Sequence, residues 1–217
     1  MQQSMQTYNA YRRTVNGSIQ LYLLKMLNNL NTYKIILASR SPRRQQLLQI
    51  MGVKFQIQTK ETDESFPAHL KREQVVMHLA LKKALAFEDD VKKNELIITA
   101  DTIVVLNDEV INKPEDRADA IQMLQKLSGN MHEVFTGVCL MSAEKKELFN
   151  VRSEVYLKPI TLNDIEYYID NYNPYDKAGA YGIQDWFGLT CIDKINGSFY
   201  NVMGMPTKEL YDNFQNF

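Results

Sequence analysis

A cluster of arginines and serines stands between an apolar segment and an expected helix. The segment ILASRSPRRQQLL, residues 36–48, contains Ser39, Arg40, Ser41, Arg43 and Arg44. Ser41 suits an N-cap and the following proline suits the first helical position. Arg43 and Arg44 then fall in the first turn, where their charge opposes the helix dipole. A bound phosphate would reverse that penalty, because free backbone N–H groups, serine hydroxyls and guanidinium groups all bind anions. A solvated basic patch capped by serine is the alternative.

An aspartate lies inside the apolar run ELIITADTIVVL, residues 95–106. Aspartate disfavours strands, and an ionised carboxylate is costly to bury alone. Asp101 therefore needs a partner such as a metal or a lysine, or else the strand breaks and Asp101 caps a local turn. Asp63 and Glu64, in a polar loop, are expected to join Asp101 around one cation, because Mg²⁺ takes one or two carboxylates with water and phosphate oxygens.

The segment DKAGAYGIQ, residues 176–184, has the composition of a ligand-binding loop. Gly179 and Gly182 would allow backbone to approach a ligand closely. The amide of Gln184 offers a donor and an acceptor, which matches the adjacent O4 and N3–H of uracil or thymine. A structural glutamine is the alternative. Lys83 and Lys113 are candidate phosphate contacts, with solvated surface lysines as the alternative.

Composition excludes several classes of protein. The net charge of −1 in 217 residues gives no global field of the kind that gathers nucleic acid, so no nucleic-acid partner is expected. No apolar run approaches the roughly 20 residues that span a bilayer, so no membrane partner is expected. Two distant cysteines and three histidines without an i,i+4 pair argue against zinc. They suit the reducing cytoplasm.

The alternation of expected elements predicts an α/β chain with a mixed sheet. Strands are expected in residues 33–39, 53–59, 95–106, 133–142 and 148–160, and helices in residues 42–51, 71–90, 115–129 and 162–172. Residues 190–206 are expected to form a strand, a turn at Asn196-Gly197 and a second strand. Residues 1–32 are interpreted as an N-terminal extension without chemistry, with Met26 as a possible alternative start.

Five ordered motifs resemble the Maf family of nucleoside triphosphate pyrophosphatases. They are LASRSPRRQQLL, ADTIVVLNDEVINKP, MLQKLSGNMHEVFTGV, YDKAGAYGIQ and INGSFYNVMGMP. The resemblance begins near Tyr33, so residues 33–217 are expected to form a Maf-like nucleotide pyrophosphatase domain and residues 1–32 a non-catalytic extension. It implies an elongated mixed β-sheet with flanking helices and two lobes around a cleft, akin to inosine triphosphate pyrophosphatase. It also implies a homodimer.

The same resemblance implies hydrolysis of a nucleoside triphosphate to the monophosphate and pyrophosphate, with Mg²⁺ or Mn²⁺. Asp101 matches the family's proposed proton acceptor. Arg43, Thr102 and Gln184 match positions tied to substrate choice, and AGAYGIQ resembles the branch that acts on dTTP and UTP. Lys83 and Lys113 match lysines near the phosphates, and Ser39 and Arg44 are added as phosphate contacts from the first motif.

Two departures from the family pattern leave questions open. Asp63-Glu64 stands where many relatives carry paired glutamates, which leaves the metal-side carboxylate unassigned. After Gln184 the chain reads DWFG, so Trp186 or Phe187 either lines the base pocket or packs beneath it.

The mechanism expected from the resemblance is water attack on the α-phosphate, with Asp101 taking a proton or holding the metal. Adjacent strand residues point to opposite faces. If Asp101 and Thr102 both reach the ligand, the strand is therefore expected to be irregular there. Two rival functions are a regulatory binding module linked to septum formation and a phosphohydrolase for modified or damaged nucleotides.

Overall fold

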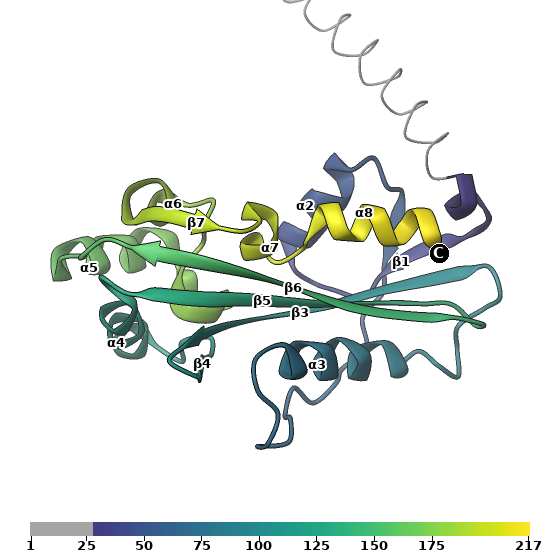
Figure 1. Ribbon diagram of the computed structural model, residues 1–217, viewed down its shortest axis with the longest axis horizontal. Helices are drawn as coiled ribbons and strands as arrows, with labels where there is room; N and C mark the ends of the chain where they lie inside the picture. Colours follow the sequence, from purple (N-terminus) through teal and green to yellow (C-terminus); the bar gives the residue numbers. More distant parts are fainter. Residues whose placement is uncertain (1–27) are drawn as a thin grey trace, which may run out of the picture.

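A mixed sheet forms the long axis of the molecule in the computed structural model, which describes residues 28–217 (Figure 1). Its seven strands lie in the order β2-β1-β3-β5-β6-β7, with β4 paired to β3. They are β1 (Lys34–Leu37), β2 (Phe55–Ile57), β3 (Glu95–Leu106), β4 (Glu109–Ile111), β5 (Met131–Met141), β6 (Lys146–Leu157) and β7 (Ile192–Asn196). The two pairs that β1 makes are parallel and the others are antiparallel. The expected α/β fold with a mixed sheet is confirmed.

Helices cover both faces of the sheet. They are α2 (Pro42–Ile50), α3 (Glu73–Leu85), α4 (Arg117–Leu127), α5 (Leu162–Tyr172), α6 (Trp186–Cys191), α7 (Phe199–Met203) and α8 (Thr207–Asn216), with 3-10 turns η1 (Asn28–Thr32), η2 (Pro174–Asp176) and η3 (Ala178–Ala180). Figure 1 shows α3 below the long strands, α2, α7 and α8 above them, and α4, α5 and α6 gathered at one end. No helix in residues 28–217 is both long and apolar enough to cross a membrane.

Strand β3 is buried on both faces, which explains its nearly continuous apolar sequence. Its even-numbered residues Leu96, Ile98 and Val104 join the large core under α2, α7 and the 178–184 segment. Its odd-numbered residues Ile97 and Ile103 pack toward α3 in two smaller clusters. The predicted strand over 95–106 is therefore confirmed at both ends.

One part of the predicted sheet is wrong. Residues 198–206 do not return as a strand, because Ser198 begins helix α7 by accepting a hydrogen bond from the backbone N–H of Asn201. The predicted turn at Asn196-Gly197 is present, and Gly197 has φ of 130°. Asn201 is fully buried and donates to Val134 O and Ser153 Oγ. The serine cap and this buried amide outweigh the weak alternating pattern that indicated a strand.

The edge of β3 opposite β5 is interrupted. Strand β1 pairs with Glu95–Ile98 and β4 pairs with Val104–Leu106, while β5 runs along the other edge. Within the described residues, no strand pairs with positions 99–103 on the β1 side. This gap in the edge opens beside Asp101 and Thr102.

Residues 1–27 lie outside the described residues, and with them most of the expected extension over 1–32 and the alternative start at Met26. The described part of that extension is η1 (Asn28–Thr32).

Candidate functional site

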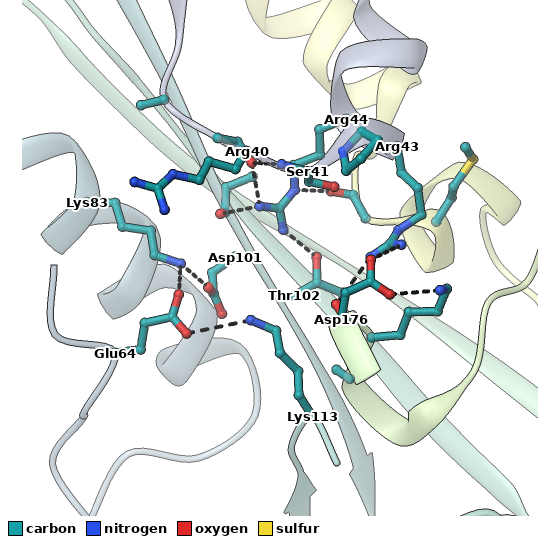
Figure 2. A pocket seen from close by; sticks show the side chains of 18 of the residues that line it. Arg40, Ser41, Arg43, Arg44, Glu64, Lys83, Asp101, Thr102, Lys113 and Asp176 are labelled. Atoms are coloured by element: carbon teal, nitrogen blue, oxygen red, sulfur yellow. Dashed lines mark hydrogen bonds and ion pairs between the residues drawn. The ribbon is translucent and has the colours of Figure 1, made fainter. Parts of the chain in front are cut away.

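A cavity of about 840 Å³ opens at the gap in the edge of β3 (Figure 2). It is built mainly by the β1–α2 loop, the polar loop after β2, the middle of β3, residues 176–184 and the end of α7, with Lys83 from α3 and Lys113 from the segment after β4. Every site residue expected from the sequence lines this cavity: Ser39, Arg43, Arg44, Asp63, Glu64, Lys83, Asp101, Thr102, Lys113 and Gln184. The fold thus brings together residues that are up to 145 positions apart in the chain (from 39 to 184).

Asp101 is mostly buried and is paired with a lysine. Its Oδ1 accepts a hydrogen bond from Lys83 Nζ at 2.5 Å, and the same Nζ donates to Glu64 Oε1 at 2.7 Å. Asp101 stays in regular register opposite Gly137 of β5. The lysine alternative is therefore the one observed, and the turn-cap alternative is wrong.

Glu64 and Asp63 have different surroundings. The hydrogen bond from Lys83 lowers the pKa of Glu64, with further contributions from Lys83 and Lys113 charge that outweigh partial burial. Lys113 Nζ lies 3.8 Å from Glu64 Oε2. Asp63 instead accepts from Ser65 and from Lys82 Nζ at 3.2 Å, and the Ser65 contacts lower its pKa to about 2. Glu64 is therefore the loop carboxylate that shares the ammonium group of Lys83 with Asp101.

The three carboxylates do not converge on one point. Within residues 28–217 no group of three or more histidine, cysteine, aspartate or glutamate side chains is arranged to hold a metal ion. Two of the three, Asp101 and Glu64, do meet at Lys83 Nζ. Two carboxylates with open space beside them are a donor set that suits a hard divalent cation.

Arg44 points inward and makes four hydrogen bonds to acceptors of the protein. It donates to Gly204 O at 2.9 Å, Ala100 O at 2.8 Å, Thr102 Oγ1 at 3.0 Å and Ser39 Oγ at 3.3 Å. Burial lowers its pKa, and the nearby charge of Asp101 opposes that shift. Arg44 thus fills the gap in the edge of β3 and ties that edge to α7. That Arg44 also contacts phosphate stays a prediction.

Arg43 faces the opposite side of the cavity. Its Nη1 donates to Asp176 Oδ2 at 2.8 Å, a partner 133 residues away. Burial disfavours the charge on Asp176, but hydrogen bonds from Lys177 and Arg43 outweigh it and lower its pKa. If Arg43 contacts the ligand, as expected, its guanidinium must bind the ligand together with Asp176 or separate from Asp176.

The N-terminus of α2 lacks a side-chain cap. Ser41 occupies the N-cap position without making that hydrogen bond. The hydroxyl of Ser39 accepts from Ser41 N at 3.2 Å and from Arg44, and these contacts leave its own O–H to donate. First-turn N–H groups without a cap and the positive end of the helix dipole remain available at the cavity.

Thr102 and Asp101 line the same cavity although β3 is regular. Their side chains point to opposite faces, as alternation requires, and Thr102 Oγ1 contacts Arg44 and Thr136 Oγ1 at 3.0 Å. Because the edge is unpaired at this position, the cavity extends around it and reaches both faces. The predicted distortion of the strand is therefore wrong.

Gln184 is exposed and lines the cavity, and the residues just before it are fixed by hydrogen bonds to the protein interior. Gly182 N donates to the hydroxyl of Tyr168 at 2.9 Å, and the Tyr181 hydroxyl lies 2.7 Å from His132 Nε2. Gly179 serves packing rather than ligand approach: its φ is 71°, and a Cβ there would stand 3.1 Å from a Val104 methyl group. These contacts fix the orientation of the segment.

The aromatic pair after Gln184 packs beneath the cavity. Phe187 is fully buried, with its ring centroid 5.1 Å from that of Tyr168. Trp186 packs on Tyr167 with ring centroids 5.1 Å apart. Neither is among the residues that line the cavity, which resolves the alternative left open by the sequence.

The lining residues that were not assigned from the sequence include Arg40, Lys60 and Asp176. Lys60 donates to Ala86 O at 2.8 Å and pairs with Asp90. Arg40 was noted only as part of the basic cluster, and no local pattern pointed to the pairing of Asp176 with Arg43.

Sequence comparisons place these residues in a known family. A sequence profile of Maf-like proteins matches residues 34–217. The dTTP/UTP pyrophosphatase of Bacteroides thetaiotaomicron is 46% identical over 187 residues, which cover 86% of this chain and 97% of that protein. The dTTP/UTP pyrophosphatases of Cytophaga hutchinsonii and Parabacteroides distasonis are 49% and 45% identical, over 87% and 88% of this chain and 86% and 100% of their own lengths.

A crystal structure described as a nucleoside-triphosphatase / dITP/XTP pyrophosphatase from Mycobacterium abscessus aligns with a TM-score of 0.40 and 16% identity, over 57% of this chain and 74% of that one. The family assignment rests on the sequence matches, which are long and specific. The chain belongs to the Maf-like protein family.

Proposed function

We propose that this protein is a nucleoside triphosphate pyrophosphatase that hydrolyses dTTP and UTP to the monophosphate and pyrophosphate. The similar proteins named dTTP/UTP pyrophosphatase support this substrate class. The observation that carries the proposal is that Lys83 donates to both the mostly buried Asp101 and Glu64, in a cavity that also contains an uncapped helix N-terminus.

The reaction needs a water molecule that attacks the α-phosphorus. The bond from that phosphorus to the bridging oxygen breaks, and its electron pair leaves with pyrophosphate. Asp101 is the group that takes the proton of the attacking water, since it is a carboxylate that lines the cavity. Lys83 and the helix N-terminus neutralise charge that develops on the phosphoryl oxygens.

Mg²⁺ or Mn²⁺ is proposed as the cofactor, held by Asp101 and Glu64. When bound, such an ion supplies positive charge that polarises phosphoryl oxygens and acidifies water. Lys83 Nζ occupies the position between the two carboxylates, so it either moves aside or shares them. The protein is further proposed to act in the cytoplasm as a homodimer.

The function is tested by measuring pyrophosphate release from all common nucleoside triphosphates, with Mg²⁺, with Mn²⁺ and with chelator. We expect dTTP and UTP to be turned over fastest, and chelator to abolish the activity. No turnover of any of them by folded protein would favour the regulatory binding module instead.

Base selection is tested at Gln184. Replacing it with glutamate removes the amide donor to O4 and should cost about 1–3 kcal/mol for UTP. Cytosine carries an amino group at that position, so the ratio of UTP to CTP turnover should fall about 5- to 150-fold. Gln49→Glu, on an exposed face of α2 away from the cavity, makes the same charge change and should leave the ratio unaltered. An unchanged ratio in Gln184→Glu would contradict this role.

A further inference from the structure

Arg40 differs from the other cations that line the cavity. Lys83 and Lys113 contact Glu64, Arg43 and Lys177 contact Asp176, and Lys60 pairs with Asp90. Arg44 has no carboxylate partner but makes four hydrogen bonds to protein acceptors.

Arg40 is exposed, and the one hydrogen bond of its side chain within the described residues is a long contact of 3.4 Å from Nε to Thr59 Oγ1. Its guanidinium therefore keeps its charge uncompensated and most of its donors open in the cavity.

The fold places Arg40 and Gln184 at opposite ends of the gap in the edge of β3. Arg40 and Thr59 follow the carboxyl ends of β1 and β2, which align with β3 at Ile98. The Gln184 segment lies at the other end of the gap, where Gly179 packs on Val104. Asp101 stands between them, and Figure 2 shows Arg40 on the Lys83 side and Arg43 with Asp176 on the other. At about 3.3 Å per residue, Ile98 and Val104 are about 20 Å apart along the strand.

This order matches the order of groups in a nucleoside triphosphate. If the base lies at Gln184 and the α-phosphate at Asp101, the β- and γ-phosphates extend toward Arg40. We propose that Arg40, assisted by the Thr59 hydroxyl, binds these two terminal phosphates and then the pyrophosphate that leaves. The inference rests on the proposed function, and it deepens that function by assigning a residue for the leaving group.

The chemistry suits this assignment. When the bond from the α-phosphorus to the bridging oxygen breaks, that oxygen takes the electron pair and the leaving group gains negative charge. A guanidinium presents parallel N–H donors that bind two phosphate oxygens together, whereas a lysine presents a single point of charge. Arg40 should therefore stabilise pyrophosphate and the transition state that leads to it, without contacting the nucleoside monophosphate.

The experiment measures inorganic pyrophosphate binding to the full-length protein by calorimetry, and inhibition of dTTP hydrolysis by pyrophosphate and by dTMP. Arg40→Gln should weaken pyrophosphate binding and pyrophosphate inhibition by about tenfold or more, because a charged hydrogen-bonding group is lost. Inhibition by dTMP should stay within about twofold of wild type. Arg40→Lys should recover part of the loss. Lys93 is exposed and lies outside the cavity, so Lys93→Ala controls for net charge. It should alter neither the affinity for pyrophosphate nor the inhibition by dTMP.

Three outcomes would overturn the inference: equal weakening of pyrophosphate and dTMP, no weakening of pyrophosphate, or no pyrophosphate binding to the wild type. Failure of the proposed function looks different. In that case the wild type hydrolyses no nucleoside triphosphate, yet calorimetry with pyrophosphate still compares wild type with Arg40→Gln. If the wild type hydrolyses dTTP and Arg40→Gln binds pyrophosphate normally, only the assignment of Arg40 fails.

Discussion

The two faces of β3 at the cavity are built from different interactions. On the α3 face, Lys83 forms ion pairs with both Asp101 and Glu64, and these pairs reach the exposed polar loop. On the opposite face, Thr102 belongs to a partly buried hydrogen-bonded network with Arg44 and Thr136. An ion pair that reaches solvent contributes little to stability, whereas leaving the carbonyl oxygens of Ala100 and Gly204, which Arg44 satisfies, without a donor would be costly. The comparison suggests that the Asp101 face carries the reaction and the Thr102 face holds the pocket in shape.

The largest expected effect is that of Asp101→Asn on the rate. The change preserves shape but removes the proton acceptor, so kcat should fall about 10²–10⁴-fold. Glu64 remains as a partner for Lys83, so the unfolding free energy should change less than in the Arg44 variant described next. Turnover and urea unfolding of the same preparation check both parts. A folded Asp101→Asn protein with near-normal turnover would show that the reaction does not depend on this face.

Arg44→Met should show the reverse pattern. Methionine keeps much of the buried volume but leaves Ala100 O, Gly204 O and Thr102 Oγ1 without their donor. With about 1–3 kcal/mol for each buried group left unpaired, and partial relaxation, we expect a loss of about 3 kcal/mol in unfolding free energy. Urea unfolding measures it. If Arg44→Met is as stable as wild type but fails to bind nucleotide, Arg44 is a phosphate ligand and the division between the faces is wrong.

Gly137→Ala tests how α3 presents Lys83 to Asp101. Gly137 lies opposite Asp101, and a Cβ there would stand 2.5 Å from Val76 O in α3. The obstacle is backbone, so the helix must move. Overpacking of this kind should cost about 1–3 kcal/mol of unfolding free energy. It should also lower kcat, because Lys83 moves with the helix. Loss of stability with unchanged kcat would show that the position of Lys83 is not critical.

The smallest effect is a pH dependence on the Thr102 face. Burial lowers the pKa of His132 to about 4, against about 6.5 in an unfolded chain. Between these values the unfolded state binds the extra proton, so the stability contribution is complete above about pH 6.5 and is lost as the pH falls toward 4. From pH 7.5 to pH 5 the wild type should therefore lose about 2 kcal/mol more than His132→Asn. Urea titrations at the two pH values measure the loss of unfolding free energy. If wild type and His132→Asn lose the same amount, His132 is excluded as the cause.

Sequence reasoning predicted the parts of this protein that depend on local patterns. The apolar run over residues 95–106 gave β3, and Thr161 and Asp164 form the predicted helix start. The site residues, which the motif resemblance identified together, all line one cavity. Local patterns also misled once: residues 198–206 alternate like a strand, but a serine cap and a buried asparagine make them a helix.

Other features depend on contacts between distant segments and could not be predicted. Nothing in the sequence distinguishes Arg43 from Arg44. In the structure, however, Arg43 pairs with Asp176, whereas Arg44 donates to Ala100 O at the edge of β3. Which guanidinium turns inward is decided by acceptors on β3 and α7, and neither element is near the arginines in sequence. The interrupted edge of β3 likewise depends on where β1 ends and β4 begins, which sets how Asp101 and Thr102 share a cavity.

The interrupted edge also has a consequence for association between chains. A stretch of strand without a neighbour exposes N–H and C=O groups that invite a strand from another molecule to pair, which leads to aggregation. Here Arg44 already donates to Ala100 O, and its bulk occupies the space that an incoming backbone would need. The same side chain that completes the wall of the cavity therefore blocks strand addition at the one place where the central strand is open along that side within the described residues.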